Sequence, residues 1–169
     1  QQRYAESLVH YQLAITQEQA TGAPSPLAIS LICQARLLID MERYSEAQLA
    51  LEEARSNIRP ADNDMILFMY DIAKASLADA TGNNAQALEF LAQGLHRGAR
   101  QQYLCWIGLI PEQLSYLLFM ALENNVERSY VHSLIHKYSI SPPQEAYPCE
   151  RWPRPVKIRT LGKFQITIN

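Results

Sequence analysis

The chain has 169 residues, with 15 Lys and Arg against 17 Asp and Glu, so it is long enough for one well-buried domain and has a formal net charge of only −2. Three cysteines without CxxC spacing argue against a disulfide framework and a zinc site and favour a reduced, cytosolic setting. No apolar run reaches the roughly eighteen residues of a membrane helix, and the polar start has no signal-peptide pattern, so we expect neither.

Apolar residues at helical spacing predict seven helices. They are expected at residues 2–20, 26–41, 44–58, 62–81, 84–99, 111–124 and 126–138. Pro26 follows Ser25, which fits an N-cap residue followed by a proline at the first helical position. Gly82 and Asn83 mark a turn, as Gly and Asn do between helices. The short connections leave little room for strands before residue 155.

Three of these helices carry related sequences at intervals of forty residues: RYAESLVHYQLA from Arg3, RYSEAQLALEEA from Arg43 and NNAQALEFLAQG from Asn83. Small residues recur seven positions apart on one helix face with a large apolar residue between them, so a neighbouring helix can approach closely. The expected packing positions are Tyr4, Ser7, Tyr11, Ala14, Ala35, Tyr44, Ala47, Leu51, Ala54, Ala75, Ala87, Leu91 and Gly94. A fixed interval predicts stacked helix pairs with a continuous core.

The first of the three helices matches the second helix of such a pair. We therefore expect a first helix before it, and the chain to be a fragment of a larger protein.

The end of the chain differs in composition from the rest. Residues 151–169 hold five basic residues and no acidic one, whereas residues 1–150 hold ten basic and seventeen acidic residues. The proline-rich segment 139–155 is predicted to be an extended linker. In 156–169 apolar residues alternate with polar ones, with Gly162 at a bulge or tight turn. The apolar positions are Val156, Ile158, Phe164, Ile166 and Ile168.

This alternation predicts one or two strands that begin a further domain, because one or two strands alone do not form a stable sheet. We expect the prolines to hold these strands away from the helices. Residues 151–169 should then contribute nothing to helical stability, and their exposed edges should favour self-association. The basic side chains either contact phosphate or are simply the polar positions of the strand.

The pattern resembles the tetratricopeptide repeat, with Leu31, Ala35, Leu38, Tyr44, Ala47, Leu51, Ala54 and Pro60 as contact residues of one unit, although forty residues exceed that repeat's usual spacing. Residues 1–138 also resemble the end of the helical-repeat domain of large MalT-like, LuxR-family ATP-dependent transcriptional regulators of bacteria. The features that carry this resemblance are Ala87-Leu88, Gly98, Tyr103-Leu104, Trp106, Leu117-Leu118, Tyr130-Val131 and Leu134-Ile135.

The fold that this resemblance implies for 1–138 is an all-α, tetratricopeptide-like right-handed superhelix. Many relatives continue into a LuxR-type helix-turn-helix, whereas VKIRTLGKFQITIN in 156–169 resembles the first strands of an OmpR-like winged-helix domain. DNA would then be contacted only by a domain beyond Asn169.

The implied function is a sensor or interaction domain. Such a domain binds an inducer or a regulatory protein, alters the oligomeric state of a neighbouring ATPase and thereby gates DNA binding. The alternative is a general protein–protein scaffold unrelated to transcription.

Motifs for other chemistry are missing from the sequence. There is no GxxxxGK[ST] stretch for nucleotide binding, and no Ser, His and acid form a nucleophile motif, so we expect neither an enzyme nor a cofactor. His132 and His136 lie one turn apart but lack the Glu of HExxH, and we interpret them as partly exposed histidines rather than metal ligands. Cys33 and Cys105 are expected to be inert core thiols.

The remaining candidate site is the concave groove, lined by the first helix of each pair, where repeat proteins bind partners. Its expected lining is Ile32, Arg36, Ile39, Asp40, Met69, Ile72, Ser76, Asp79, Tyr116, Phe119 and Met120. This mixture suits a small-molecule effector or an amphipathic peptide, with Arg36 as the anion contact and Asp40 holding it. Alternatively, the apolar members pack against the next helix or against the linker.

Overall fold

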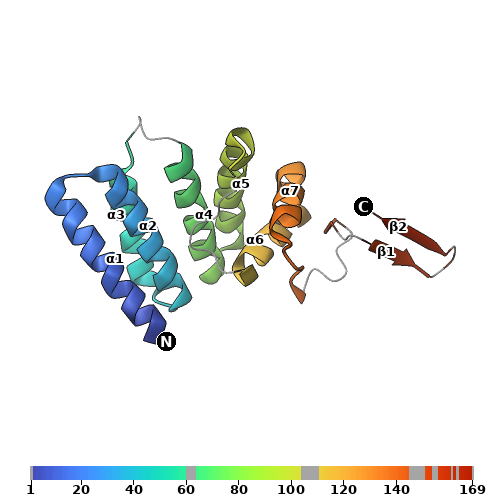
Figure 1. Ribbon diagram of the computed structural model, residues 1–169, viewed down its shortest axis with the longest axis horizontal. Helices are drawn as coiled ribbons and strands as arrows, with labels where there is room; N and C mark the ends of the chain where they lie inside the picture. Colours follow the sequence, from blue (N-terminus) through green and yellow to red (C-terminus); the bar gives the residue numbers. More distant parts are fainter. Residues whose placement is uncertain are drawn as a thin grey trace. The chain divides into compact units, whose positions relative to one another are not determined.

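The computed structural model describes residues 2–59, 64–103, 111–144, 151–153, 156–160, 162 and 164–168. The chain forms two compact units, residues 1–110 and residues 111–169, which are described separately. In its described part the chain is all-α apart from one short strand pair (Figure 1).

All seven predicted helices are present, and the prediction of an all-α fold is confirmed. They are α1 (Gln2–Thr21), α2 (Pro24–Asp40), α3 (Tyr44–Asn57), α4 (Asp64–Ala80), α5 (Asn84–Gln101), α6 (Pro111–Glu123) and α7 (Arg128–Tyr138). The two strands are β1 (Val156–Arg159) and β2 (Gln165–Ile168). No described helix is both long and apolar enough to span a bilayer.

The predicted start of α2 was wrong. The helix begins at Pro24 rather than Pro26, and its N-cap residue is Ala23, whose side chain makes no capping bond, instead of Ser25. The first backbone N–H groups of a helix have no intrahelical acceptor, so both prolines fit within the first turn without the loss of a hydrogen bond.

The helices of unit 1 form two hairpins that repeat at an interval of forty residues. Helices α2 and α4 begin and end forty residues apart, and so do the first residues of α3 and α5. The same turn joins each pair: the N–H of Glu42 bonds the carbonyl of Ile39, and the N–H of Gly82 bonds that of Asp79. Both turn residues are left-handed, with φ of 59° and 77°, as a Schellman helix end requires.

The predicted packing columns form the core of the second and third repeats. Ala47, Ala87, Leu51 and Leu91 are all 0 % exposed, and Ala35, Ala54 and Ala75 are equally buried. Helix α3 packs on α2, and α5 packs on α4. The small side chains therefore lie where the paired helices meet.

Gly94 shows how close this approach is. A Cβ atom added to Gly94 would lie 2.8 Å from Cδ1 of Ile72 and 3.3 Å from Cβ of Asp71, both on α4. Real Cβ atoms essentially never approach another atom as closely as 2.8 Å, and 3.3 Å is already tighter than most of their contacts. The glycine thus lets α5 lie directly against the α4 side chains.

The same columns are less buried in α1. Tyr4 is 36 % exposed, while Ser7, Tyr11 and Ala14 are half-buried, although their equivalents in α3 and α5 are mostly buried. Helix α1 packs on α2, and Gln19 Nε2 donates to Glu53 Oε1 of α3 at 3.0 Å. In α3 the equivalent residues are covered by the preceding helix, α2. No described helix covers α1 in this way, which accounts for the greater exposure of its residues.

In unit 2, α6 and α7 pack against each other. The turn after α6 has the same form as the turns of unit 1: the N–H of Asn125 bonds Leu122 and that of Val126 bonds Ala121, with Asn125 at φ 57°. Ser115 Oγ donates to the carbonyl of Ser141 at 2.6 Å, which ties the segment after α7 back to α6.

The strands form an antiparallel hairpin with Val156 opposite Ile168 and Ile158 opposite Ile166. Alternate positions of paired strands belong to one face of a hairpin, so this backbone register agrees with the predicted alternation. Lys157 is paired with Thr167, and Arg159 is paired with Gln165. Gly162 lies in the loop between the strands with φ 84°. Arg154 and Lys163 lie outside the described residues.

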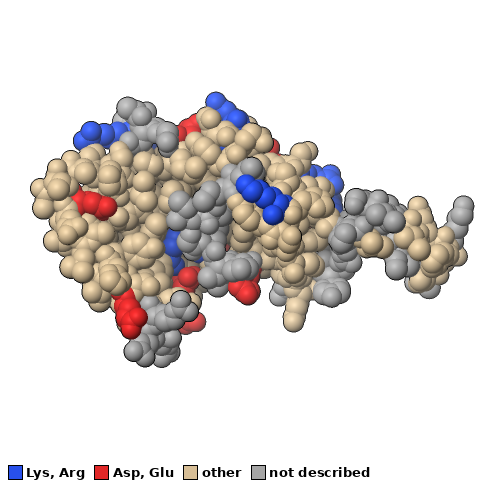
Figure 2. Space-filling model, in the orientation of Figure 1, with Lys and Arg blue, Asp and Glu red and all other residues tan. Residues whose placement is uncertain are grey.

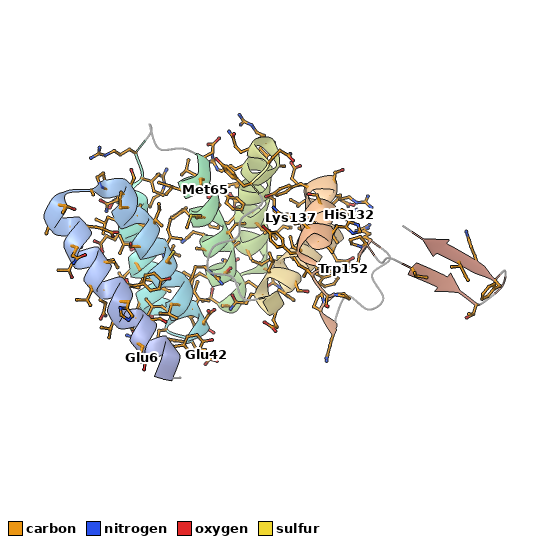
Figure 3. All side chains as sticks on the ribbon, viewed as in Figure 1. Glu6, Glu42, Met65, His132, Lys137 and Trp152 are labelled. Atoms are coloured by element: carbon orange, nitrogen blue, oxygen red, sulfur yellow. The ribbon has the colours of Figure 1, made fainter. Side chains whose placement is uncertain are left out.

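Residues 151–169 were expected to contribute nothing to helical stability, but the contacts of residues 151–153 argue against this. Trp152 is only 1 % exposed. Next to it, Nη1 of Arg151 donates to the carbonyl of Glu123 at 2.6 Å, and the carbonyl of Arg151 lies 3.0 Å from Nε2 of His132 on α7. Figure 3 labels His132 and Trp152. Burial of the large Trp152 side chain stabilises the contact of this segment with the helices.

We predict that Ala87→Leu destabilises the protein by about 1–3 kcal/mol, because added methylenes at a closed helix crossing force backbone and side chains to shift. Ala85→Leu, on the exposed side of the same helix, is the matched control and should change stability little. Urea denaturation followed by circular dichroism measures both. Equal effects of the two substitutions would contradict the repeat alignment.

A second prediction concerns the tail. Deletion of 156–169 should leave the melting temperature nearly unchanged, because β1 and β2 pack chiefly on each other. Deletion of 151–169 should lower it, since that deletion also removes Trp152 and the Arg151 bonds to α6. Trp152→Ala alone should cost about 3 kcal/mol of stability. If both deletions had the same small effect, the anchoring role of Arg151 and Trp152 would be wrong.

Candidate functional site

The predicted groove residues of α2 and α4 lie mostly in the core. Ile32, Ile39, Met69 and Ile72 are all buried. Ser76 is also buried, and its hydroxyl donates to the carbonyl of Ile72 at 3.0 Å. In unit 1 these side chains therefore belong to the core, and Ile72 lies against Gly94 of the next helix, α5, as the alternative interpretation proposed for the apolar members.

Arg36, the predicted anion contact, is 3 % exposed. Its burial lowers the pKa of the guanidinium, and the nearby Asp40 and Cys33 act in the opposite direction. A solute cannot reach this guanidinium unless the helices around it move. Asp40 and Asp79 are half-buried at the ends of α2 and α4, and burial raises the pKa of Asp79.

The other predicted groove residues lie on α6 in unit 2. Tyr116 is exposed, and its ring centroid lies 6.5 Å from that of Phe119. Phe119 and Met120 are half-buried. Since the two units are described separately, these three residues are not brought into one surface with those of α2 and α4. A binding role for them remains a prediction.

A charged cluster that the sequence analysis missed joins α4 to α5. Arg97 Nε donates to Asp71 Oδ2 at 3.0 Å, and Arg97 Nη1 lies 3.3 Å from Asp64 Oδ1. Gln101 Nε2 adds a hydrogen bond to Asp64 Oδ2 at 2.9 Å. Burial raises the pKa of Asp71, and the Arg97 hydrogen bond and charge partly offset this rise. The cluster is interpreted as structural, because it closes a helix pair.

A pocket of about 280 Å³ lies within unit 1, between α3, the end of α4 and the start of α5. Its described lining consists of Tyr44, Ser45, Gln48, Lys74, Leu77, Ala78, Thr81 and Gln86. This lining includes one cation, Lys74, and neither an aspartate nor a glutamate. Leu77 and Ala78 are buried and provide an apolar base, while the other side chains bring hydroxyl, phenol and amide groups.

Lys74 is held in place from two sides. Its Nζ lies 3.3 Å from Oε1 of Gln48 and 5.4 Å from the centroid of the Phe90 ring. An ammonium has three N–H donors, so a hydrogen bond to Gln48 leaves capacity for a ligand. The arrangement can bind an anion without first ordering a flexible lysine.

The described residues contain no group of three or more His, Cys, Asp or Glu positioned to hold a metal ion. His132, one of the two histidines considered in the sequence, instead meets the Arg151 carbonyl. Cys33 is buried, and burial raises the pKa of its thiol, which disfavours the reactive thiolate. Cys105 and Cys149 lie outside the described residues.

Figure 2 shows how charge is distributed over one face. The described Lys, Arg, Asp and Glu side chains there are scattered among uncharged ones, and they form no extended basic patch on that face. An extended basic patch would be the footprint of direct nucleic-acid binding. The candidate site that the described residues support best is the Lys74 pocket, because its lining places one held cation among hydroxyl and amide groups.

Comparisons with protein-family models, with curated proteins and with solved structures found no match.

The charged cluster gives a prediction with a pH dependence. Arg97→Met should destabilise the protein by about 1–3 kcal/mol at neutral pH, because the buried Asp71 carboxylate loses its partner. The expected loss is smaller than for a fully buried pair, since the Arg97 side chain is 33 % exposed. Urea denaturation of wild type and variant measures it.

The loss should shrink on acidification. Without Arg97, burial raises the Asp71 pKa further above its ordinary 3.8, so the folded variant binds a proton more tightly than the unfolded chain does. The stability of the variant relative to the wild type therefore rises as the pH falls from the raised Asp71 pKa toward 3.8. Arg100→Met, on the exposed part of α5, is the control. A loss that is independent of pH, or equal in the control, would contradict this assignment.

Proposed function

We propose that the chain is a sensor or interaction domain of a bacterial transcriptional regulator of the MalT-like, LuxR-family type. The observation that supports this most is the hairpin repeat at forty residues, with α2 and α4 as first helices and α3 and α5 as second helices. Repeats of this kind present extended surfaces to ligands and partner proteins. The proposal includes a tetratricopeptide-like, right-handed superhelix for residues 1–138.

The hairpin of β1 and β2 supports the second part of the proposal. Its register pairs Val156 with Ile168 and Ile158 with Ile166, and the side chains of Val156, Phe164 and Ile166 are exposed. An exposed apolar strand face fits the first strands of a domain whose remaining elements would cover it. In the proposal that domain is an OmpR-like winged helix, and it makes the contacts to DNA.

Arg151 and Trp152 suggest how a signal passes along the chain. They fix the segment just before β1 to the end of α6 and to His132 of α7. A ligand or partner that shifts the helices would thereby move the start of the strand hairpin. In this proposal the domain is cytoplasmic and non-catalytic, and it gates oligomerisation and DNA binding by the rest of the protein.

The test uses the complete gene product in the bacterium that encodes it. Chromatin immunoprecipitation of an epitope-tagged copy should enrich a limited set of promoter sites, while an untagged strain provides the background. Residues 1–169 alone should show no sequence-specific DNA binding by fluorescence anisotropy. A general scaffold, the alternative, would give no enriched sites, and that result would overturn the regulatory assignment.

A further inference from the structure

The two hairpins provide an internal comparison for the Lys74 pocket. Subtracting forty from a residue number in α3, α4 or α5 gives the equivalent position in α1, α2 or α3. Every residue that lines the pocket therefore has a counterpart in the earlier repeat. Repeats that share a fold need the same packing residues at equivalent positions. Positions that differ in chemistry are therefore candidates for a function specific to one repeat.

The three residues around the ammonium all differ from their counterparts. Lys74, Gln48 and Phe90 correspond to Gln34, Leu8 and Ala50. These three earlier positions therefore hold no cation and no aromatic ring, and Leu8 offers no acceptor where Gln48 does. In the later repeat the three occur together, and both contacts to the Nζ atom are made.

The walls of the pocket differ as well. Ala78 and Thr81 correspond to Leu38 and Met41, which are larger and apolar. Leu38 is buried, so its side chain fills space at the point where Ala78 leaves the pocket open. The later repeat therefore has smaller side chains at these two positions, and one of them, Thr81, is polar.

The acidic residue of this region is also absent from the later repeat. Gln86 corresponds to Glu46, which pairs with Arg43 at 2.6 Å. The equivalent side-chain pair in the later repeat is neutral: Asn83 Nδ2 donates to Gln86 Oε1 at 3.4 Å, and the backbone N–H of Gln86 donates to Asn83 Oδ1 at 3.3 Å. No carboxylate in the described lining opposes Lys74.

We propose that this pocket binds a small hydroxylated organic anion, with its carboxylate on Lys74 and its hydroxyl groups on Gln48, Thr81 and Gln86. A volume of about 280 Å³ suits a compact solute, since it lies just below the range of roughly 300–1,000 Å³ typical of ligand pockets. A single ammonium among hydroxyl and amide groups favours one negative charge with several hydrogen-bonding groups around it. This inference rests on the repeat comparison and is independent of a role in transcription.

The experiment titrates the purified chain with sodium gluconate and follows backbone amides by two-dimensional NMR. Glucose is the uncharged control, since it has similar hydroxyl groups but no carboxylate. Inorganic phosphate and acetate are the control anions, since neither has a carbon-bound hydroxyl. Gluconate should shift the amides of the lining residues saturably, and glucose, phosphate and acetate should bind more weakly. If gluconate shifts no lining amide at millimolar concentration, or if glucose shifts them as strongly, the proposal is overturned.

Variants with the residues of the earlier repeat separate the site from general charge effects. Lys74→Gln should weaken gluconate binding roughly tenfold, because a charge-assisted hydrogen bond is lost. Thr81→Met should weaken it by narrowing the entrance. Arg100→Gln removes an exposed cation that is not part of the lining and should bind as the wild type does.

Wild-type affinity in Lys74→Gln, or an equal loss in Arg100→Gln, would overturn the proposal. Circular dichroism establishes that each variant is folded. If Lys74→Gln did not fold, Thr81→Met would decide, and unchanged binding in that variant would overturn the proposal.

Discussion

The close approach of the two helices within each hairpin, at positions held by alanine or glycine, is the constraint on which unit 1 depends. Ala47 and Ala87 have no exposed surface, and a Cβ at Gly94 would touch the side chain of Ile72. The chain can reverse in the three residues between helices because Glu42 and Gly82 adopt left-handed conformations that close each helix end. Contact and turn together fix the register of the two helices within each hairpin.

Once these positions are fixed, the remaining surface of each repeat is able to diverge. The earlier repeat has Gln34 and Leu38 where the later one has Lys74 and Ala78, yet both hairpins keep the same turn and the same buried columns. Such a division is the expected outcome when packing sets the fold and the positions around it are free to acquire a binding function. In a repeat protein, differences between units locate a site that no single motif reveals.

In unit 2 the helix pair is also held by packing, but part of the contact comes from the segment that follows the helices. Helices α6 and α7 are a short pair, and the chain supplements their contact with Trp152, which is buried, and with Arg151, which bonds carbonyls at the end of α6. A cation at a helix C-terminus is favoured both by these carbonyls and by the helix dipole. The segment that leads to the strand hairpin is thus held by the helices that precede it.

The sequence alone determined the seven helices seen in the described residues, their ends to within two residues, the small-residue columns and the alternation of the strands, because each depends on spacing along one stretch of chain. The tertiary structure decided which faces meet. In the folded chain Arg36 and Trp152 are buried, Arg97 pairs with Asp71, and a pocket lies beside Lys74. None of these follows from periodicity, because a polar side chain on a helix looks the same in sequence whether its neighbour is solvent, a carboxylate or another helix.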